Sequence, residues 1–332
     1  MLMSKNPKVS VIIPVYGVER FIERCSRSLM EQTLDDIEYI FVDDASKDKS
    51  IELLNNILDF YPKRKECVSI ITHEFNAGLP AARNTGLKYA KGEYVFHCDS
   101  DDFLELNALE LLYNAAKNYD ADIVWCDWFL TFEKNERHMT EPSFTNPLLA
   151  LKAMLGGGMK YNVWNKLVRR RLYVDNDIEF PAGHGMGEDM TMMLLFAYAE
   201  KVCHIDYALY HYVKMNTSAF THTISQVNFD SVKYNVERVS KKIISLFGEQ
   251  FESELAFLKL EAKFPLLVMS SDFSFYRLWN EWYPEANSFI MKNKNVSLRS
   301  RIVQCCARYH LYWIVWLHYQ IVCRFVYGFI YK

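Results

Sequence analysis

Three carboxylates stand within four positions of the 332-residue chain, directly after a short apolar run. The run Tyr94-Val-Phe96 predicts a buried strand, and Asp99, Asp101 and Asp102 follow it. Carboxylates this close repel one another unless a cation or ordered hydrogen-bond donors neutralise them. Hard oxygen ligands suit Mg²⁺ or Mn²⁺, and such ions also bind substrate phosphates. The spacing therefore indicates a metal and phosphate site, with helix capping by Asp102 as the alternative for that residue.

A second acidic pair, Glu188 and Asp189, follows the glycine-rich stretch Gly183-His-Gly-Met-Gly187 and precedes an apolar run predicted as a helix. Glycines allow the backbone to approach another molecule closely. A carboxylate held at such a junction can act as a general base that takes the proton from an attacking hydroxyl group. The alternative is that Asp189 only caps the helix that follows.

The elements that must position these carboxylates alternate between apolar runs and amphipathic stretches along the first hundred residues. This alternation predicts a doubly wound α/β layer with a mainly parallel sheet. In such sheets ligands bind at the carboxyl ends of the strands, where Asp43, Asp44 and Asp99 lie. The predicted strands are Lys8–Tyr16, Glu38–Val42, Val68–Ile71 and Tyr94–Phe96, and the predicted helices between them are Glu19–Gln32, Ser50–Tyr61 and Ala81–Ala90.

The chain continues with a mixed pattern and then becomes helical. Ala108–Tyr119 predicts a helix, Ala121–Cys126 a strand, and the polar stretch 133–146 a loop over the active-site face. Tyr207 begins the predicted last strand, and His211 and His222 near it are either ligands of a metal or diphosphate or structural residues. From Gln226 helical spacing dominates, over Val232–Phe247, Phe251–Met269, Phe275–Trp282 and Arg301–Tyr331.

Composition places the chain among folded proteins, with 50% hydrophobic and 24% charged residues. The eight cysteines include no CxxC pair, and this distribution is typical of reduced, mostly buried thiols. The N-terminal stretch is short, polar and basic and lacks the apolar core of a signal peptide. No GxGxxG or GxxxxGK[ST] motif is present, so neither a dinucleotide site nor a P-loop is supported. These features predict a cytoplasmic protein.

The residues after Glu285 are unusual, because they include seven Lys and Arg side chains and no Asp or Glu. The runs Leu311–Leu317 and Ile321–Tyr331 are aromatic and apolar but shorter than the roughly 18 residues that a spanning helix needs. We expect a helix lying in a membrane interface, at the inner face of the plasma membrane. Packing in a core or in a homodimer is the alternative. The basic stretch has no nucleic-acid-binding motif beside it, so no nucleic-acid partner is expected.

Four ordered motifs in roughly the first 105 residues resemble the family 2 glycosyltransferases of the bacterial polysaccharide-biosynthesis type. The motifs are Val9-Ser-Val-Ile-Ile-Pro-Val-Tyr16, Val42-Asp-Asp-Ala-Ser46, Asn76-Ala-Gly-Leu-Pro-Ala-Ala-Arg-Asn-Thr-Gly86 and Asp99-Ser-Asp-Asp102. The resemblance implies an inverting enzyme with the GT-A fold that uses nucleotide-diphospho sugars, with Mn²⁺ or Mg²⁺ as cofactor.

The same resemblance implies roles for individual residues. Asp44 would hold the base, most simply uracil, and Asp101 would be the principal metal ligand. Asp189 matches the catalytic base of the family, with Glu188 in support. Segment 163–171 resembles a WNKLYRR-like stretch of one branch of the family, which puts Trp164 and Lys166 on the donor and acceptor side. The remaining residues implied to bind the nucleotide are Pro14, Val15, Tyr16, Glu19, Arg83, Asp99 and Ser100.

These features predict a GT-A catalytic domain over residues 1–222 and a helical C-terminal region over 223–332 with a basic, aromatic terminal helix. Within the catalytic domain, residues 1–105 form the nucleotide-sugar half and 106–222 the acceptor half. The expected reaction moves a sugar from a nucleotide-diphospho sugar, with UDP preferred, to a hydroxyl of a glycan or lipid-linked saccharide. The alternative is an inactive sugar-nucleotide-binding or scaffolding protein of a polysaccharide-assembly complex. A sugar-1-phosphate nucleotidyltransferase is disfavoured, because Val15-Tyr-Gly-Val18 is no glycine-rich basic phosphate loop.

Overall fold

The computed structural model describes residues 7–215 and 226–330 of the chain. The chain divides into two compact units, of which the first comprises Met1–Leu149 and Tyr161–Asn235, and the second Ala150–Lys160 and Val236–Lys332. The domain boundary predicted after residue 222 and the candidate His222 lie outside the described residues.

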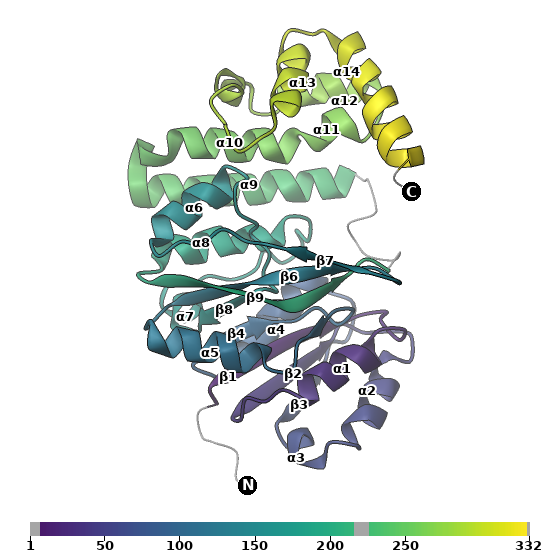
Figure 1. Cartoon of the computed structure of the whole chain (residues 1–332), viewed down its shortest axis with the longest axis vertical. Helices are drawn as coiled ribbons and strands as arrows, with labels where there is room; N and C mark the ends of the chain where they lie inside the picture. The colour runs from purple at the N-terminus through teal and green to yellow at the C-terminus, as the bar shows by residue number, and fades with distance from the viewer. Residues whose placement is uncertain (1–6, 216–225, 331–332) are drawn as a thin grey trace. The chain divides into compact units, whose positions relative to one another are not determined.

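Four parallel strands form the N-terminal half of the sheet in the first unit. β1 is Val9–Val15, β2 Ile37–Asp43, β3 Val68–Thr72 and β4 Tyr94–His97, and they pair in the order β3-β2-β1-β4 (Figure 1). β1 and β4 are buried along their whole length, as continuous apolar strands covered on both faces must be. The acidic residues that follow β2 and β4 therefore emerge at the same edge of the sheet.

The other half of the sheet mixes parallel and antiparallel pairs. β8 (Lys166–Arg169) runs antiparallel to β4 and to β6 (Ile123–Thr131), and β6 runs parallel to β9 (Val202–Val213). The two-residue strand β5 (Phe103–Leu104) pairs with β9 directly after the carboxylate cluster. The sheet is thus mostly parallel, as predicted, and β9 connects its last strands to the loop that carries Asp99 and Asp101.

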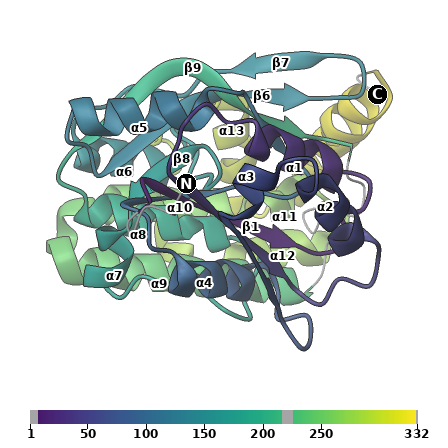
Figure 2. The same ribbon diagram turned by 90° about the horizontal axis from the view of Figure 1, so that it is seen from below.

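Helices cover both faces of the sheet, since alternate residues of each strand point to opposite sides. α1 (Ile22–Met30) and α5 (Ala108–Asn118) pack with Val11 and Ile13 in one core, whereas α4 (Leu79–Tyr89) contacts β1 and β2 (Figure 2). A Cβ on Gly86 would lie 2.3 Å from Cγ2 of Ile12, so the glycine lets α4 approach β1 closely. The remaining helices of this unit are α2 (Ser50–Leu58), α3 (Pro62–Lys65), α7 (Arg171–Asp175) and α8 (Thr191–Tyr198).

One predicted loop is wrong. Residues Glu136–Met139, inside the stretch predicted as a loop over the active-site face, form β7, which pairs antiparallel with β6. Its side chains are mostly exposed, so the strand carries none of the apolar alternation by which half-buried strands are found. Backbone pairing with β6, which no local pattern encodes, makes this segment a strand.

The second unit is helical, as predicted for the C-terminal region, but two predicted helices are divided. The stretch predicted as one helix from residue 251 ends at Lys263, and Pro265 begins a new helix because proline cannot donate the backbone hydrogen bond. The predicted helix from residue 301 is interrupted near His310, whose φ is +59°. Two helices, α6 (Pro147–Leu155) and α9 (Gln226–Phe247), contribute residues to both units. The helices confined to the second unit are α10 (Glu252–Lys263), α11 (Pro265–Val268), α12 (Phe273–Glu281), α13 (Leu298–Arg308) and α14 (Tyr312–His318). This unit also contains 3₁₀ turns at Gly248–Phe251 and Pro284–Phe289 and a π-helical segment, Tyr319–Ile330.

Candidate functional site

The loop after β4 presents two of its three carboxylates towards the carboxyl edge of the sheet and buries the third. The Asp99 side chain is 24% exposed and Asp101 is half-buried, whereas Asp102 is buried. The Asp102 carboxylate accepts hydrogen bonds from the Tyr210 hydroxyl and the Val213 backbone N–H, each at 2.7 Å. Asp102 therefore fastens the loop to β9, whereas the side chains of Asp99 and Asp101 stay partly accessible.

Burial raises the pKa of Asp102 well above its ordinary value, and the charges of Asp101 and Asp99 raise this pKa further. The charges of the two neighbouring carboxylates thus repel that of Asp102. A ligand that supplies positive charge beside Asp101 would relieve the repulsion.

Arg83 connects this loop with the second acidic pair. Its guanidinium lies 2.9 Å from Oδ1 of Asp99 and 3.0 Å from Oε1 of Glu188, and its side chain is 1% exposed. Burial alone would lower the pKa of Arg83, but the charges of Glu188 and Asp99 raise it above the ordinary value, so the side chain is a permanent cation. An amphipathic helix alone predicts a solvated arginine at this position, and the fold instead buries Arg83 between two carboxylates.

Glu188 and Asp189 begin a 3₁₀ turn that leads into α8. The preceding Gly187 has φ +82°, and the Asn235 side-chain amide donates to the backbone carbonyls of His184 and Met186 at 3.2 and 3.1 Å. These contacts fix the glycine loop that the sequence predicted as a carrier of the base. Oδ1 of Asp189 and Oε2 of Glu188 are buried and have no hydrogen-bond partner among the residues that the structure describes.

The protonation of the pair follows from its surroundings. Burial raises the pKa of Asp189, while Arg83 opposes this rise and Asp99 adds to it. Burial also raises the pKa of Glu188, which the Arg83 charge opposes and the Asp189 charge increases. Two carboxyl groups in contact titrate as a pair and do not both ionise easily. A raised pKa suits a group that must accept a proton during a reaction near neutral pH.

The residues expected to bind the nucleotide lie in two environments. Tyr16 is 51% exposed immediately after β1, so its ring is open to stacking, whereas Pro14 and Val15 are buried in the strand. The Glu19 carboxylate accepts a hydrogen bond from the Lys49 backbone N–H at 3.1 Å. Tyr16 and Glu19 are thus the exposed side chains among these four residues.

Asp44 is buried and holds a loop. Its carboxylate accepts hydrogen bonds from the backbone N–H groups of Ala77 and Gly78, each at 2.8 Å, and lies 2.8 Å from Nδ1 of His73. A carboxylate has about four lone-pair positions, so these three contacts leave room for one more donor. This arrangement fixes the loop that leads into the helix of Arg83.

Trp164 and Lys166 lie beneath the site rather than at its surface. Trp164 is 5% exposed and its ring stacks on Tyr210 and Tyr212, with centroids 4.5 and 5.4 Å apart. The ammonium of Lys166 donates to the Asn162 carbonyl oxygen at 2.7 Å and to Oδ1 of Asn165 at 2.8 Å. Burial lowers the pKa of Lys166 to about 8, opposed by carboxylates that include Asp189.

The sequence prediction missed Tyr210 and Tyr212 as residues of the site. Burial raises the pKa of Tyr212 to about 12, and the charges of Asp102, Asp99, Asp101 and Asp189 add to the rise. The alternating aromatic residues of the predicted last strand were the available signal, but such alternation is also typical of plain packing.

His211, which the sequence left open as a ligand, is held within the fold. Its ring stacks between Phe103 and Phe129, and its two nitrogens lie 3.0 Å from Oε1 of Glu105 and 2.8 Å from Oε1 of Glu136. Both nitrogens are therefore engaged by carboxylates of the chain itself.

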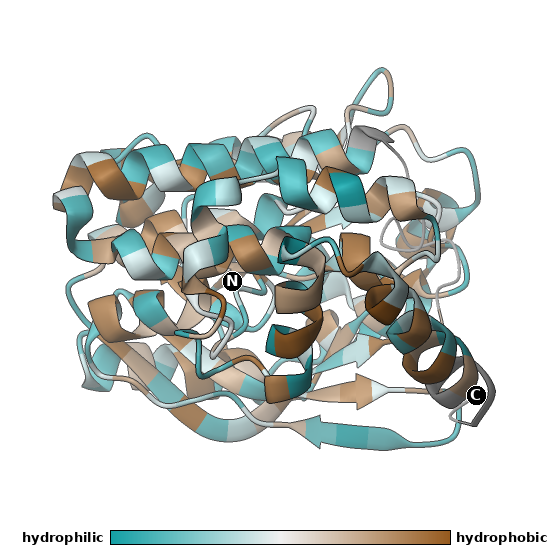
Figure 3. Ribbon diagram, turned by 90° about the horizontal axis from the view of Figure 1, so that it is seen from above, coloured by the Kyte–Doolittle hydropathy of each residue, from teal (hydrophilic) through white to brown (hydrophobic). Residues whose placement is uncertain are grey.

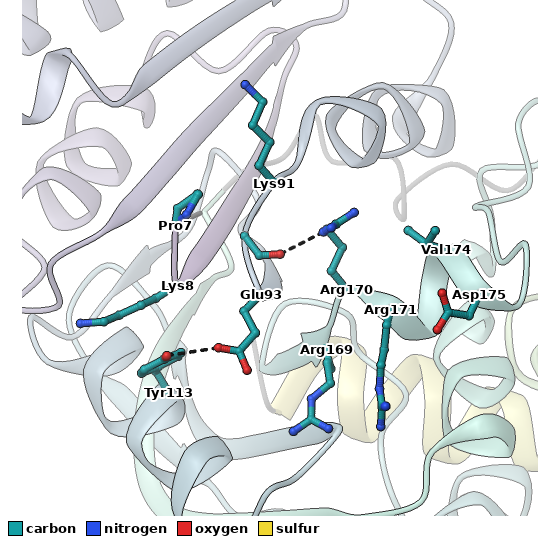
Figure 4. A pocket seen from close by; sticks show the side chains of 11 residues that line it. Pro7, Lys8, Lys91, Glu93, Tyr113, Arg169, Arg170, Arg171, Val174 and Asp175 are labelled. Atoms are coloured by element: carbon teal, nitrogen blue, oxygen red, sulfur yellow. Dashed lines mark hydrogen bonds between the residues drawn. The ribbon is translucent and has the colours of Figure 1, made fainter. Parts of the chain in front are cut away.

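A pocket of about 560 Å³ lies at the other edge of the sheet, where β1 and β4 begin and β8 ends. Figure 4 shows the Arg170 side chain donating to the Gly92 carbonyl oxygen, at 3.0 Å, and the Tyr113 hydroxyl bonded to Glu93, at 3.3 Å. None of the site residues predicted from the sequence lines this pocket.

The donor set after β4 fits a divalent cation that shares its coordination with a substrate. No group of three or more His, Cys, Asp or Glu side chains arranged to hold a metal occurs among the described residues. Mg²⁺ is commonly bound by one or two carboxylates together with waters and substrate phosphates. Asp101 and Asp99 have the oxygen atoms that such a site needs, and Asp99 also pairs with Arg83 at 2.9 Å.

An α/β sheet with partly accessible carboxylates after its fourth strand, linked by a buried arginine to a second carboxylate pair, is typical of a nucleotide-sugar transferase of the GT-A type. The profile of Glycosyl transferase family 2 matches residues 10–186, and the chain belongs to this family.

Curated relatives agree with this assignment. The chain is 36% identical over 218 residues to the uncharacterized glycosyltransferase EpsJ of Bacillus subtilis, a match that covers 62% of this chain and 61% of EpsJ. It is 30% identical over 249 residues to the glycosyltransferase GlyG of Streptococcus pneumoniae, covering 71% of this chain and 79% of GlyG. The chain thus spans less than two thirds of EpsJ but more than two thirds of GlyG.

Solved structures show the same fold. TarS 1–349 of S. aureus superposes with a TM-score of 0.67 at 20% identity, covering 94% of this chain and 91% of that chain, and its complex with UDP-GlcNAc superposes with 0.64 at 19% identity and the same coverage. A mannosyltransferase of Pyrobaculum calidifontis in complex with GDP-Man and Mn²⁺ has a TM-score of 0.54 at 15% identity, covering 96% of this chain and 88% of that chain. The predicted family, the glycosyltransferase class and the GT-A fold with C-terminal helices are confirmed.

Replacing Tyr210 tests whether β9 positions the carboxylate loop. We expect Tyr210→Phe to lower kcat/KM for sugar transfer by about 10–100-fold, because a small displacement of reacting groups has an effect of this size. The hydroxyl bonds Asp102 at 2.7 Å and accepts the Asp99 backbone N–H at 3.1 Å, so its loss frees the loop. Steady-state kinetics with a nucleotide-sugar donor measures the effect.

The matched control is Tyr276→Phe in the second unit, which removes a buried hydroxyl bonded to the Ser270 carbonyl oxygen at 2.9 Å. We expect the control to lower the melting temperature and to leave kcat/KM near the wild-type value. Equal kinetics for Tyr210→Phe and the wild type would show that the hydroxyl does not position the loop.

Proposed function

We propose that this chain is an inverting glycosyltransferase that moves a sugar from a nucleotide-diphospho sugar, with UDP preferred, to a hydroxyl of a glycan or lipid-linked saccharide. The observation that carries the proposal is the buried Arg83, which lies 2.9 Å from Asp99 and 3.0 Å from Glu188. It joins the carboxylates suited to a diphosphate and the carboxylates suited to a base into one site.

In the proposed reaction Asp189 accepts the proton of the acceptor hydroxyl. The hydroxyl oxygen forms a bond to the anomeric carbon while the bond from that carbon to the diphosphate oxygen breaks on the opposite face, and the nucleoside diphosphate leaves with the electron pair. Attack from the opposite face inverts the configuration of the sugar. The raised pKa of the buried Asp189 supports its role as the proton acceptor.

Arg83 and Glu188 would position the base. The Arg83 cation between Asp99 and Glu188 keeps the two acidic groups at a fixed separation, and Glu188 contacts Asp189. Glu188 therefore supports Asp189 through the shared charge of the pair rather than as the proton acceptor.

The donor would lie between Tyr16 and the loop after β4. The exposed ring of Tyr16 is suited to stack on the base, while Asp44 has one lone-pair position left for a ring N–H. Asp99 and Ser100 would contact the ribose, and Asp101 would hold Mn²⁺ or Mg²⁺, whose charge stabilises the leaving diphosphate when the ion is bound. The UDP-GlcNAc complex of TarS and the Mn²⁺ complex of the mannosyltransferase support this choice of donor and ion.

The acceptor would approach from the side of Asp189 and Tyr212. The stacked rings of Trp164 and Tyr212 support this side of the site, with Lys166 buried behind them. We place the reaction at the cytoplasmic face of the plasma membrane, where a lipid-linked acceptor would be presented. This part of the proposal is supported by the cationic, aromatic character of the residues after Glu285, and homodimer formation is the alternative use of that region.

A binding and turnover experiment separates transferase from scaffold. We expect UDP together with Mn²⁺ to raise the melting temperature more than UDP alone does. In Asp101→Asn the additional stabilisation by Mn²⁺ should require an Mn²⁺ concentration that is higher by about 10–100-fold or more. Removal of divalent ions with EDTA should abolish transfer or hydrolysis of a UDP-sugar. Asp35→Asn, an exposed carboxylate change outside the site, is the matched control.

Two results would contradict the proposal. Binding of UDP-sugar without any transfer or hydrolysis in the presence of Mn²⁺ would favour the inactive, sugar-nucleotide-binding protein. Full activity of Asp101→Asn in EDTA would show that the carboxylate does not act through a divalent ion.

A further inference from the structure

The terminal helices of the second unit turn their apolar side outward. Trp313, Trp316 and Leu317 of α14 are 62%, 41% and 43% exposed, and Ile321 and Phe325 of the π-helical segment are 51% and 57% exposed. We call these five residues the apolar face. Their spacing, mostly of three and four residues, places them along one side of the helix. Figure 3 shows that the helical ribbon leading to the C-terminal label carries many hydrophobic residues.

The covered side of α14 is apolar in part. Val315 is buried, and Tyr312, Ile314 and His318 are partly covered. A helix that folds only to cover a core keeps polar residues on its outer side, whereas the outer side of α14 carries Trp313, Trp316 and Leu317. The neighbouring α13, which packs on α14, adds the exposed side chains Leu298, Ile302 and Tyr309.

Two arginines lie in the helices that carry the apolar face or next to it. Arg308 and Arg324 are exposed, and their guanidinium groups donate to the Asn287 carbonyl oxygen at 3.0 Å and to Oε1 of Gln320 at 3.3 Å. Residues 286–332 contain seven Lys and Arg and no Asp or Glu. The nearby Asp272 caps α12, where its carboxylate accepts the Ser274 backbone N–H at 2.8 Å.

An anionic lipid surface complements this arrangement better than a second copy of the chain. Tryptophan and other amphipathic aromatic residues favour the interface between lipid and water, and Lys and Arg side chains are attracted to anionic headgroups. A two-fold contact uses the same patch on both copies and would bring cations against cations. No helix of the described part of the chain is long and apolar enough to cross a bilayer, so a helix lying along the surface is the geometry that remains for it.

We propose that the apolar face of α14 and the following π-helical segment inserts into the surface of an anionic bilayer, with Arg308 and Arg324 contacting the headgroups. The proposal deepens the membrane position stated under the proposed function and names the side chains that produce it. It does not require sugar transfer, so a test by vesicle binding succeeds or fails separately from the enzyme assay.

The test is co-sedimentation of the full chain with vesicles of pure phosphatidylglycerol and of pure phosphatidylcholine. We expect the wild type to sediment with the anionic vesicles and to remain in solution with the zwitterionic ones. The double variant Trp313→Ser/Trp316→Ser should require at least about tenfold more lipid for half-maximal binding, because it lacks the two aromatic side chains that insert into the bilayer. Raising the salt concentration should also release the wild type, since salt screens the headgroup attraction.

The matched control is Tyr119→Ser/Tyr207→Ser, which removes two exposed aromatic residues of the first unit, 66% and 56% accessible in the folded chain. We expect this variant to bind anionic vesicles as the wild type does, and melting curves verify that both variants fold. Equal lipid requirements for the Trp variant and the wild type would overturn the proposal. A wild-type dimer in light scattering that becomes monomeric only in the Trp variant, without any vesicle binding, would assign the face to a second copy.

Discussion

Asp189→Asn should lower kcat for sugar transfer by about 100–10,000-fold and leave the affinity for the nucleotide nearly unchanged, as expected for removal of a general base. Asparagine fills the same volume but cannot take the proton of the acceptor hydroxyl. Asp189 lies in the 3₁₀ turn before α8, whereas the residues proposed for the nucleotide follow β1, β2 and β4. Transfer assays and calorimetric titration with UDP measure the two quantities.

The pH dependence of the wild type provides a second measurement. Burial raises the pKa of Asp189, so the basic, deprotonated form is lost at a higher pH than for a solvated aspartate. We therefore expect kcat to fall as the pH is lowered through this raised value, and the fall to be absent from the residual activity of Asp189→Asn. Because Glu188 titrates together with Asp189, the acid limb reports the pair.

Asp206→Asn is the matched control, since Asp206 is an exposed aspartate of β9. Its kcat and its pH profile should match those of the wild type. Wild-type turnover in Asp189→Asn would refute the assignment of the base, and Glu188 would then be the residue to examine.

Arg83→Met should lower the melting temperature by roughly 10 °C or more and abolish donor binding. Removing one partner of a buried ion pair costs about 3–5 kcal/mol, because the remaining charge stays buried, and about 1 kcal/mol corresponds to about 2–4 °C in a chain of this size. Here the change leaves both Asp99 and Glu188 without their cation. Thermal melting and titration with UDP and Mn²⁺ measure the two effects.

Arg27→Met is the control for loss of an arginine ion pair. Arg27 pairs with Glu23 at 3.0 Å on the surface of α1, where the side chains are 41% and 60% exposed, so solvent already screens the charges. We expect its melting temperature to stay close to that of the wild type. Arg83→Lys adds a second readout, since lysine keeps the charge but cannot reach both carboxylates as the planar guanidinium does. An unchanged melting temperature for Arg83→Met would show that the bridge does not hold the site together.

The sequence determined the architecture of the first four strands and the positions of the acidic residues along the chain. Continuous apolar runs ending in Asp43 or Asp99 predict buried parallel strands, and parallel strands carry their carboxyl ends to one edge. The ordered motifs up to Asp102 were sufficient for the family, because four motifs with correct spacing rarely coincide. The cationic, aromatic character of the residues after Glu285 was also evident from composition.

Only the tertiary structure decided which of these residues touch. Helical spacing cannot tell that Arg83 is buried, since the carboxylates that neutralise it are 16 and 105 residues away along the chain. The strand β7 forms from polar residues because β6 offers its backbone groups, and no side-chain pattern encodes that pairing. The sequence predicted a structural role for Asp102 as an alternative to ligand binding, but the partners that hold it, Tyr210 and Val213 of β9, are known only from the fold. Local sequence fixes residue type and element, whereas burial and charge pairing arise from segments that meet only in the folded chain.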